Sequence, residues 1–186
     1  GKSLVNTILS NNGYTVYDLG KQVPVNTIIE KALEVKADAI GLSALLVSTS
    51  KQMPLCVQEL HSRKLTFPVL CAGTAINPSF IRNASFVDQE QKTLYPSGVF
   101  YCKDAFEGLS TVETLLDPQR RAAFVEARHT DVLEGVAKRA VKHLEQFLER
   151  AEGYTKGKVV LATVYGDVHD IGKSLVNTIL SNNGYT

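Results

Sequence analysis

The sequence lacks any apolar run long enough to cross a bilayer, and it lacks an excess of charge of either sign. Its 20 basic and 19 acidic residues leave a formal net charge of +1, which does not favour a nucleic-acid or membrane surface. It has only three cysteines, which are widely spaced in apolar stretches: Cys56, Cys71 and Cys102. We therefore expect reduced, buried thiols in a cytoplasmic protein whose partners are a cofactor or other protein domains.

The chain has 186 residues, of which 44% are hydrophobic. That length is sufficient for one well-filled α/β domain with a small appendage. The first residues read as an internal position of a longer protein.

A perfect internal duplication stands out. The segment GKSLVNTILSNNGYT occupies residues 1–15 and returns unchanged as residues 172–186. Diverged natural repeats do not keep perfect identity over one segment while sharing nothing else. Joined through the shared segment, the two ends of the chain read as one continuous strand–loop–helix–strand. The first strand of the domain and its loop therefore lie at the C-terminus of this chain.

Three origins of this order compete: a circular permutation, a window cut from a tandem array, or a chain written out of its natural order. A rearranged or permuted chain is favoured over a natural array. One domain has room for one copy of the duplicated helix. The other copy is expected to be undocked or to enter a neighbouring molecule as a domain swap, which would give a homo-oligomer.

Short apolar strands alternate with amphipathic helices along the chain. The expected strands are 158–164, 16–19, 39–47, 68–71 and 98–102. Four helices are expected. One begins near Lys173, one begins at Pro24, one includes Met53, Val57 and Leu60, and one extends from about Asp104 to Leu116. This alternation predicts a flavodoxin-like, doubly wound, five-stranded parallel sheet, whose ligands bind outside the carboxyl ends of the strands. The loops at 165–172, 43–50 and 72–77 all fall at that edge.

The expected domain organisation has three parts. Residues 1–130 form the bulk of the α/β domain, and residues 157–186 supply its first strand, loop and helix. Residues 131–156 carry an apolar stripe on an otherwise charged helix, which needs a partner surface. This helix is either a docked linker or one member of a helical cap.

The informative constellation is Asp167-Val168-His169-Asp170-Ile171-Gly172, at a strand-to-helix turn. A histidine on such a loop projects into the ligand crevice, where an imidazole nitrogen can bind a transition metal. Asp167 can accept a hydrogen bond from the other ring nitrogen and so fix the tautomer. Gly172 lets the backbone pass close to a bulky flat ligand.

This string matches the DxHxxG signature of cobalamin-binding (B12) domains, with Asp167, His169 and Gly172 at the motif positions. The similarity continues through VYDLGKQVP and ADAIGLSALL and covers most of the chain. VYDLG-x-x-VP followed by GLS-x-L resembles most closely the cobalamin-binding domain of cobalamin-dependent methionine synthases. The helix at 131–153 looks like the last helix of the four-helix cap that precedes this domain in that family.

The resemblance implies a cobalamin cofactor, as methylcobalamin, whose dimethylbenzimidazole leaves the cobalt and whose tail enters the sheet. His169 is then the cobalt ligand, and Asp167 and Thr49 continue a hydrogen-bond relay from it. The remaining residues that the resemblance places around the cofactor are Val168, Asp170, Ile171, Gly172, Ser43, Leu45, Val47, Ser48, Gly73 and Thr74. The sequence departs from the family pattern at Val47, where a hydroxyl residue is common, and at Ala72, where glycine is usual.

The resemblance further implies a methyltransferase module that carries a methyl group on cobalt between methyltetrahydrofolate and homocysteine in methionine biosynthesis. The homocysteine, methyltetrahydrofolate and reactivation domains are absent from this chain, so it is not expected to turn over alone. Two alternatives remain: the B12-binding subunit of an adenosylcobalamin mutase, which shares the histidine loop, and a non-catalytic B12 sensor. A flavodoxin-like domain without a corrinoid is a fourth possibility, since fold alone does not specify function.

Overall fold

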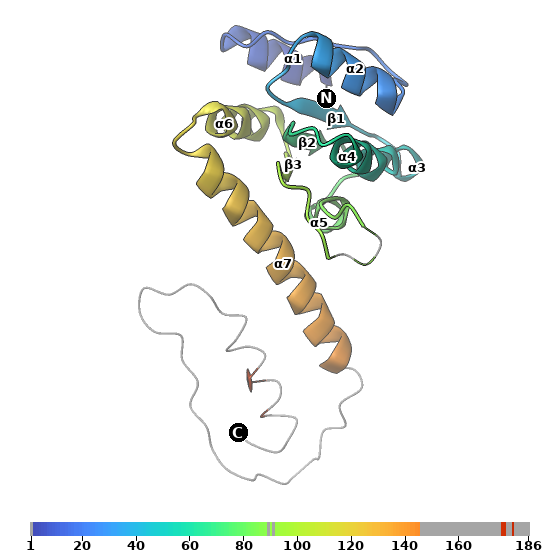
Figure 1. The fold of residues 1–186 in the computed structure, drawn as a ribbon, viewed down its shortest axis with the longest axis vertical. Coiled ribbons are helices and arrows are strands. Elements are labelled where there is room, and N and C mark those ends of the chain that lie inside the picture. The colour runs from blue at the N-terminus through green and yellow to red at the C-terminus, as the bar shows by residue number, and fades with distance from the viewer. Residues whose placement is uncertain (1, 89, 91, 146–175, 178–179, 181–186) are drawn as a thin grey trace. The chain divides into compact units, whose positions relative to one another are not determined.

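The computed structural model describes residues 2–88, 90, 92–145, 176–177 and 180 (Figure 1). The chain divides into two compact units, Gly1–Val132 and Leu133–Thr186. The expected strand at 158–164 and the histidine loop lie outside the described residues. The expected domain bounds at 130/131 and 156/157 remain predictions.

The first unit is built on a parallel sheet. Strands β1 (Ile40–Ser43), β2 (Val69–Ala72) and β3 (Val99–Tyr101) lie in the order β1-β2-β3. The register pairs Ile40 with Val69 and Val69 with Val99. The parallel sheet with intervening helices confirms the predicted α/β class. The described residues form three strands, however, and not the five expected.

The segment Val16–Leu19, expected as a strand, pairs with no strand among the described residues. Tyr17 is 53% exposed and Leu19 is 38% exposed. In a flavodoxin-like sheet this segment pairs with the first strand of the domain, for which the sequence offers residues 158–164. A strand without a neighbour has no hydrogen-bond ladder, so this element is not formed among the described residues.

The described strands alternate with helices, and Figure 1 shows α4 and α6 on opposite sides of the strands. Helices α2 (Val25–Glu34), α4 (Gln52–Ser62) and α6 (Ala105–Leu116) confirm three expected elements. Pro24 stands at the N-cap of α2 and Asp104 at that of α6, where its carboxylate accepts hydrogen bonds from the N–H groups of Phe106 and Glu107.

The N-terminal copy of the duplicated segment forms helix α1 (Lys2–Asn11), which packs against α6. Its end is marked by Gly13, whose φ is +87°. Helix α5 (Pro78–Ala84) was not predicted, although Asn77 caps it and accepts a hydrogen bond from the N–H of Phe80. A short helix, α3 (Val47–Ser50), follows the loop after β1.

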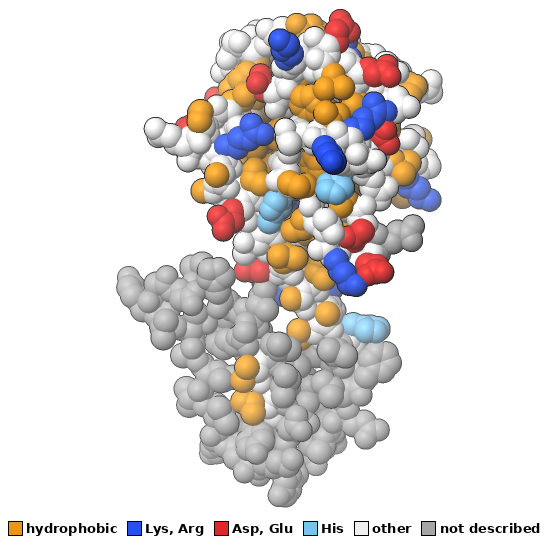
Figure 2. Space-filling model, viewed as in Figure 1, with side chains coloured by type: hydrophobic (Ala, Val, Ile, Leu, Met, Phe, Trp, Pro, Cys, Tyr) orange, Lys and Arg blue, Asp and Glu red, His pale blue; other side chains and the backbone are white. Residues whose placement is uncertain are grey.

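The core lies between the sheet and its covering helices, with buried residues that include Ile29, Val57, Leu60, Val69 and Val99. All three cysteines are free and buried, as expected. On the face shown in Figure 2, hydrophobic, acidic and basic side chains of the described residues are interspersed. No described helix is long and apolar enough to cross a membrane.

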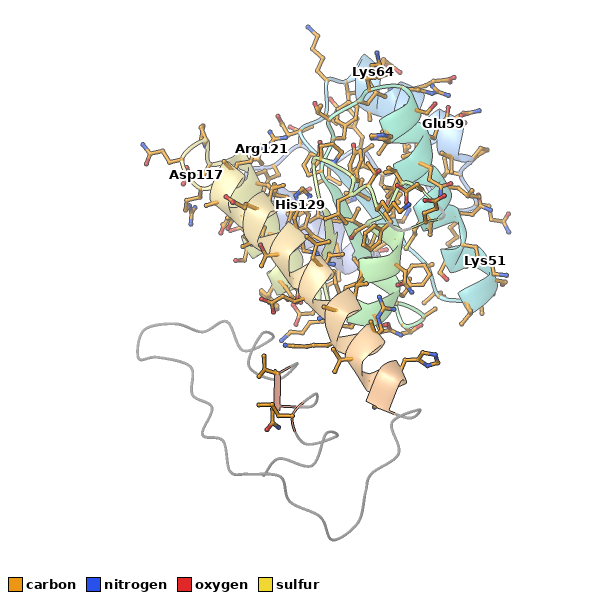
Figure 3. All side chains as sticks on the ribbon, turned by 60° about the horizontal axis from the view of Figure 1, so that its bottom comes forward. Lys51, Glu59, Lys64, Asp117, Arg121 and His129 are labelled. Carbon is orange, nitrogen blue, oxygen red and sulfur yellow. The ribbon has the colours of Figure 1, made fainter. Side chains whose placement is uncertain are left out.

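Helix α7 (Arg121–Glu145) begins ten residues before the apolar stripe expected from Asp131. Its first turns pack on the sheet unit. The ring of Phe124 stacks on that of Phe100 at 5.1 Å, and the Nε of Arg128 donates to the Val99 carbonyl at 2.7 Å. His129, labelled in Figure 3, lies with Nε2 3.0 Å from the Tyr95 carbonyl oxygen. One ring stack and two contacts to backbone carbonyl oxygens therefore connect the start of α7 to residues 95–100.

Candidate functional site

Two strands end together at one edge of the sheet. Ser43 at the end of β1 pairs in register with Ala72 at the end of β2. The backbone connection continues beyond the strands, because the N–H of Ala44 donates to the Ala72 carbonyl at 3.1 Å. The segments that follow, 44–50 and 73–77, therefore start side by side at the edge where doubly wound sheets bind their ligands.

Gly73 is required by the close approach of these two segments. Its φ is +130°, and a Cβ placed on it would lie 1.9 Å from the Ala44 carbonyl oxygen. Thr74 then crosses to the other segment, with its hydroxyl 3.4 Å from the Leu45 carbonyl oxygen. The expected Gly73 and Thr74 thus hold the two strand ends together.

The segment after β1 exposes three consecutive apolar side chains. Leu45 is 73% exposed, Leu46 is 62% exposed and Val47 is 72% exposed. The expectation of a buried strand over Ala39–Val47 is therefore wrong for its second half, since β1 ends at Ser43. Beyond that point the chain leaves the sheet, and no strand among the described residues covers it. These three neighbouring side chains, called the apolar patch below, are a candidate binding surface.

The predicted polar loop Ser48-Thr49-Ser50 is part of the short helix α3. The hydroxyl of Thr49 donates to the Leu46 carbonyl at 2.9 Å, and that of Ser50 donates to the Val47 carbonyl at 2.8 Å. These side-chain bonds close the turn, which a loop assignment did not anticipate. Ser48 and Thr49 are exposed beside the apolar patch, whereas Ser50 is buried.

The structure brings together seven of the expected site residues at this edge: Ser43, Leu45, Val47, Ser48, Thr49, Gly73 and Thr74. The other six lie outside the described residues: Asp167, Val168, His169, Asp170, Ile171 and Gly172. Leu46 was not among the expected site residues, although it stands between Leu45 and Val47 in the apolar run that follows β1. Within the described part of the chain, no group of three or more His, Cys, Asp or Glu side chains could hold a metal ion.

The edge suits a large, partly apolar ligand. The apolar patch offers a surface for the edge of a flat macrocycle, and the exposed hydroxyls of Ser43, Ser48 and Thr49 lie in the same segment. The absence of a side chain at Gly73 keeps the two strand ends close beneath it. These features fit a corrinoid, which has an apolar ring and polar amide side chains.

The family model for the B12 binding domain matches residues 1–93, which is half of the chain. The methionine synthase of Mycobacterium tuberculosis is 34% identical over 164 residues, covering 87% of this chain and 12% of that protein. The methionine synthase of Mycobacterium leprae is 38% identical over 125 residues, covering 66% of this chain and 10% of that protein. Dimethylamine corrinoid protein 3 of Methanosarcina mazei is 55% identical over 49 residues, covering 26% of this chain and 29% of that protein.

The chain thus spans about a tenth of the length of the methionine synthases that it matches. The matched region contains α1, the whole of β1 and β2 and the apolar patch between them. The family match and the geometry of this sheet edge agree, and the chain belongs to the B12 binding domain family.

Proposed function

We propose that this chain is the cobalamin-binding module of a methyl-transferring enzyme of the methionine synthase type. The main observation behind this proposal is the exposed patch of Leu45, Leu46 and Val47 at the carboxyl edge of the sheet. The chain that presents it belongs to the B12 binding domain family. The names of the relatives support the reaction class, since they are methionine synthases and a dimethylamine corrinoid protein.

When bound, cobalamin supplies a cobalt ion that can accept and release a methyl group. Residues of this chain would hold it. Leu45, Leu46 and Val47 would cover the apolar edge of the ring, and desolvation of their side chains would contribute to affinity. Gly73 and Thr74 would keep the strand ends closed beneath it, while Ser43 would face the buried base.

His169 would bind the cobalt in place of the dimethylbenzimidazole. Asp167 would accept a hydrogen bond from the other imidazole nitrogen and hold the tautomer that leaves the metal-binding nitrogen unprotonated. Thr49, exposed on α3, would extend this relay. In the methionine synthase reading, methyltetrahydrofolate would donate the methyl group and homocysteine would accept it.

For the five-stranded sheet, residues 158–164 would pair with the free edge of β1 on one side and with Val16–Leu19 on the other. That arrangement would place the loop at 165–171 beside Ser43 and the apolar patch, because all parallel strands end at the same edge. The run KVVLATV is short, apolar and rich in β-branched residues, as is typical of a buried parallel strand, and this composition supports the proposal.

The test is reconstitution of the full chain with hydroxocobalamin, followed by absorption spectroscopy. We expect a spectrum in which histidine has replaced dimethylbenzimidazole on cobalt, and we expect His169→Ala to abolish it. His61→Ala, an exposed position on α4, is the matched control and should leave the spectrum unchanged. A spectrum insensitive to His169→Ala would reject the ligand assignment.

The choice of cofactor separates the reaction classes. Tighter binding of methylcobalamin than of adenosylcobalamin supports the methyl carrier. The reverse preference would indicate a mutase subunit, and a change of oligomeric state on illumination would indicate a sensor module.

A further inference from the structure

Two arginines share one carboxylate where the last turn of α5 lies beside α7. The Nη2 of Arg82 donates to the Oδ1 of Asp131 at 3.2 Å, and the Nη1 of Arg128 donates to the Oδ2 of the same carboxylate. These three side chains are called the charged triad below. The Nε of Arg128 also donates to the carbonyl of Val99, the first residue of β3. The charged triad therefore lies toward the amino end of that strand, away from the carboxyl edge proposed for the corrinoid.

The charged triad has more buried donors than Asp131 can satisfy. The Nε of Arg82 and the Nη2 of Arg128 are buried, and neither has a hydrogen-bond partner among the described residues. Each carboxylate oxygen of Asp131 already accepts from one arginine. Because buried N–H groups of charged side chains are costly to leave unpaired, these two donors need a further acceptor.

The charge of the triad favours an anion over water as that acceptor. Two guanidinium groups meet one carboxylate, so the triad carries a net positive charge. The side chain of Arg128 is 13% exposed, which leaves little solvent to screen its charge. The side chain of Asp131 is 47% exposed, so it is the member of the triad that can turn toward solvent most easily.

A tetrahedral oxyanion suits this arrangement better than a carboxylate does. A carboxylate offers two acceptor oxygens in one plane, whereas phosphate offers more oxygens and is bound bidentately by guanidinium groups. We propose that Arg82 and Arg128 form a binding site for a small free oxyanion of the phosphate class, which Asp131 occupies from within until the anion displaces it. This site is independent of the corrinoid function proposed above.

The experiment is a titration of the full chain with inorganic phosphate at constant ionic strength, with sodium chloride as the balancing salt. Isothermal titration calorimetry measures affinity, and the unfolding temperature should rise with phosphate because a ligand of the folded state stabilises it. Asp131→Asn should bind phosphate about tenfold more tightly than the unsubstituted chain, since it removes a competitor of like charge. Arg82→Gln should bind about tenfold more weakly or not at all, since it loses charge-assisted hydrogen bonds.

The control is a second arginine that also pairs with a carboxylate. Arg63, at the end of α4, forms an exposed pair with Glu59, and Arg63→Gln should leave phosphate binding unchanged. Arg82→Lys keeps the positive charge but lacks the guanidinium Nε–H, so it should bind phosphate more weakly than the unsubstituted chain. This variant also serves if Arg82→Gln does not fold.

Nuclear magnetic resonance follows the unpaired donor directly. On addition of phosphate, the Nε–H resonance of Arg82 should shift, because this group gains an acceptor. The Nε–H resonance of Arg128 should shift less, because that group already donates to the Val99 carbonyl.

Several outcomes would overturn the site. If phosphate stabilises no variant more than sodium chloride does at the same ionic strength, water satisfies the donors and the salt effect is screening alone. Equal losses of affinity in Arg82→Gln and Arg63→Gln would indicate diffuse attraction of anions to the surface. Equal affinity in Arg82→Lys and the unsubstituted chain would contradict the hydrogen bonds assigned to the guanidinium group.

Two further outcomes concern the role of Asp131. Equal phosphate affinity in Asp131→Asn and the unsubstituted chain would show that Asp131 does not occupy the site. Binding confined to Asp131→Asn would show that the carboxylate is a permanent member of the triad and is not displaced.

Discussion

Gly73 connects the local backbone with the candidate site. Its φ of +130° lies in a region that L side chains rarely adopt, and the Ala44 carbonyl oxygen occupies the position of a Cβ. A side chain here would have to push apart the ends of β1 and β2. The same displacement would move the apolar patch that follows Ala44.

Gly73→Ala is expected to lower the free energy of unfolding by about 2–4 kcal/mol, through steric overlap and backbone strain. Urea denaturation of the full chain measures this loss. Gly108→Ala is the matched control, because a Cβ at Gly108 in α6 would meet nothing within 4 Å. That variant should be neutral or gain up to about 1 kcal/mol from helix propensity. Equal losses in both variants would contradict the steric account.

At the scale of elements, α5 and α7 are joined by one carboxylate between two guanidinium groups. Asp131 accepts from Arg82 at 3.2 Å and also forms an ion pair with Arg128. The side chain of Arg128 is 13% exposed, and burial lowers the pKa of its guanidinium. The Nε of Arg82 and the second terminal nitrogen of Arg128 are buried without a hydrogen-bond partner in the described structure. Asp131 therefore compensates two charges that are costly to bury.

Asp131→Asn should destabilise the chain by about 1–2 kcal/mol, since two guanidinium groups would then face each other without a carboxylate. The estimate is kept low because the side chain of Asp131 is 47% exposed. Urea midpoints at low and high sodium chloride measure the effect, and salt should reduce the deficit by screening the repulsion. Glu59→Gln, which removes the exposed pair with Arg63, should cost less than about 1 kcal/mol. A larger effect at Glu59 than at Asp131 would contradict this ranking.

At the scale of the whole molecule, buried acidic groups link stability to pH. Burial raises the pKa of Cys56 and of Cys102 to about 11 and that of Tyr95 to about 12. Burial also raises the pKa of Cys71. In each case the folded state keeps a proton that the unfolded chain loses at lower pH. The contribution of Cys56 and Cys102 is therefore complete below the ordinary thiol pKa of about 9 and is lost as the pH rises through 11.

The unfolding free energy should consequently fall between pH 8.5 and pH 10.5, by an amount on the order of 2 kcal/mol for each thiol. Urea midpoints across this range measure the slope. Cys56→Ala should make the fall shallower, because one of the groups that keeps its proton is removed. A slope unchanged by this substitution would show that Cys56 does not contribute to the pH dependence.

Several elements of the described domain were predictable from the sequence, because their signals are local. Pro24 and Asp104 mark helix starts through backbone geometry and capping, and apolar periodicity identifies α4 and β2. The extent of the strand after Ala39 was not predictable. The run Leu45-Leu46-Val47 is as apolar as a buried strand, and only the departure of the chain from the sheet exposes it.

The same division holds for the candidate site. Gly73, Thr74 and Ser43 could be placed at one edge from the alternation of strands and helices, because parallel strands end together. The turn that forms α3 depends on hydrogen bonds from hydroxyl groups to backbone carbonyls three residues earlier. Serine and threonine make such bonds in helical turns and in loops alike, so the sequence does not distinguish the two conformations.

By itself the sequence determined the α/β class, the local helix starts and the motifs by which the chain resembles cobalamin-binding domains, since these depend on neighbouring residues. Tertiary structure decided the exposure of the apolar patch, the lack of a partner strand for Val16–Leu19 among the described residues, and the docking of the N-terminal copy on α6. The segments 1–15 and 172–186 carry identical local information because their sequences are identical, so only their connections to the rest of the chain can distinguish one from the other.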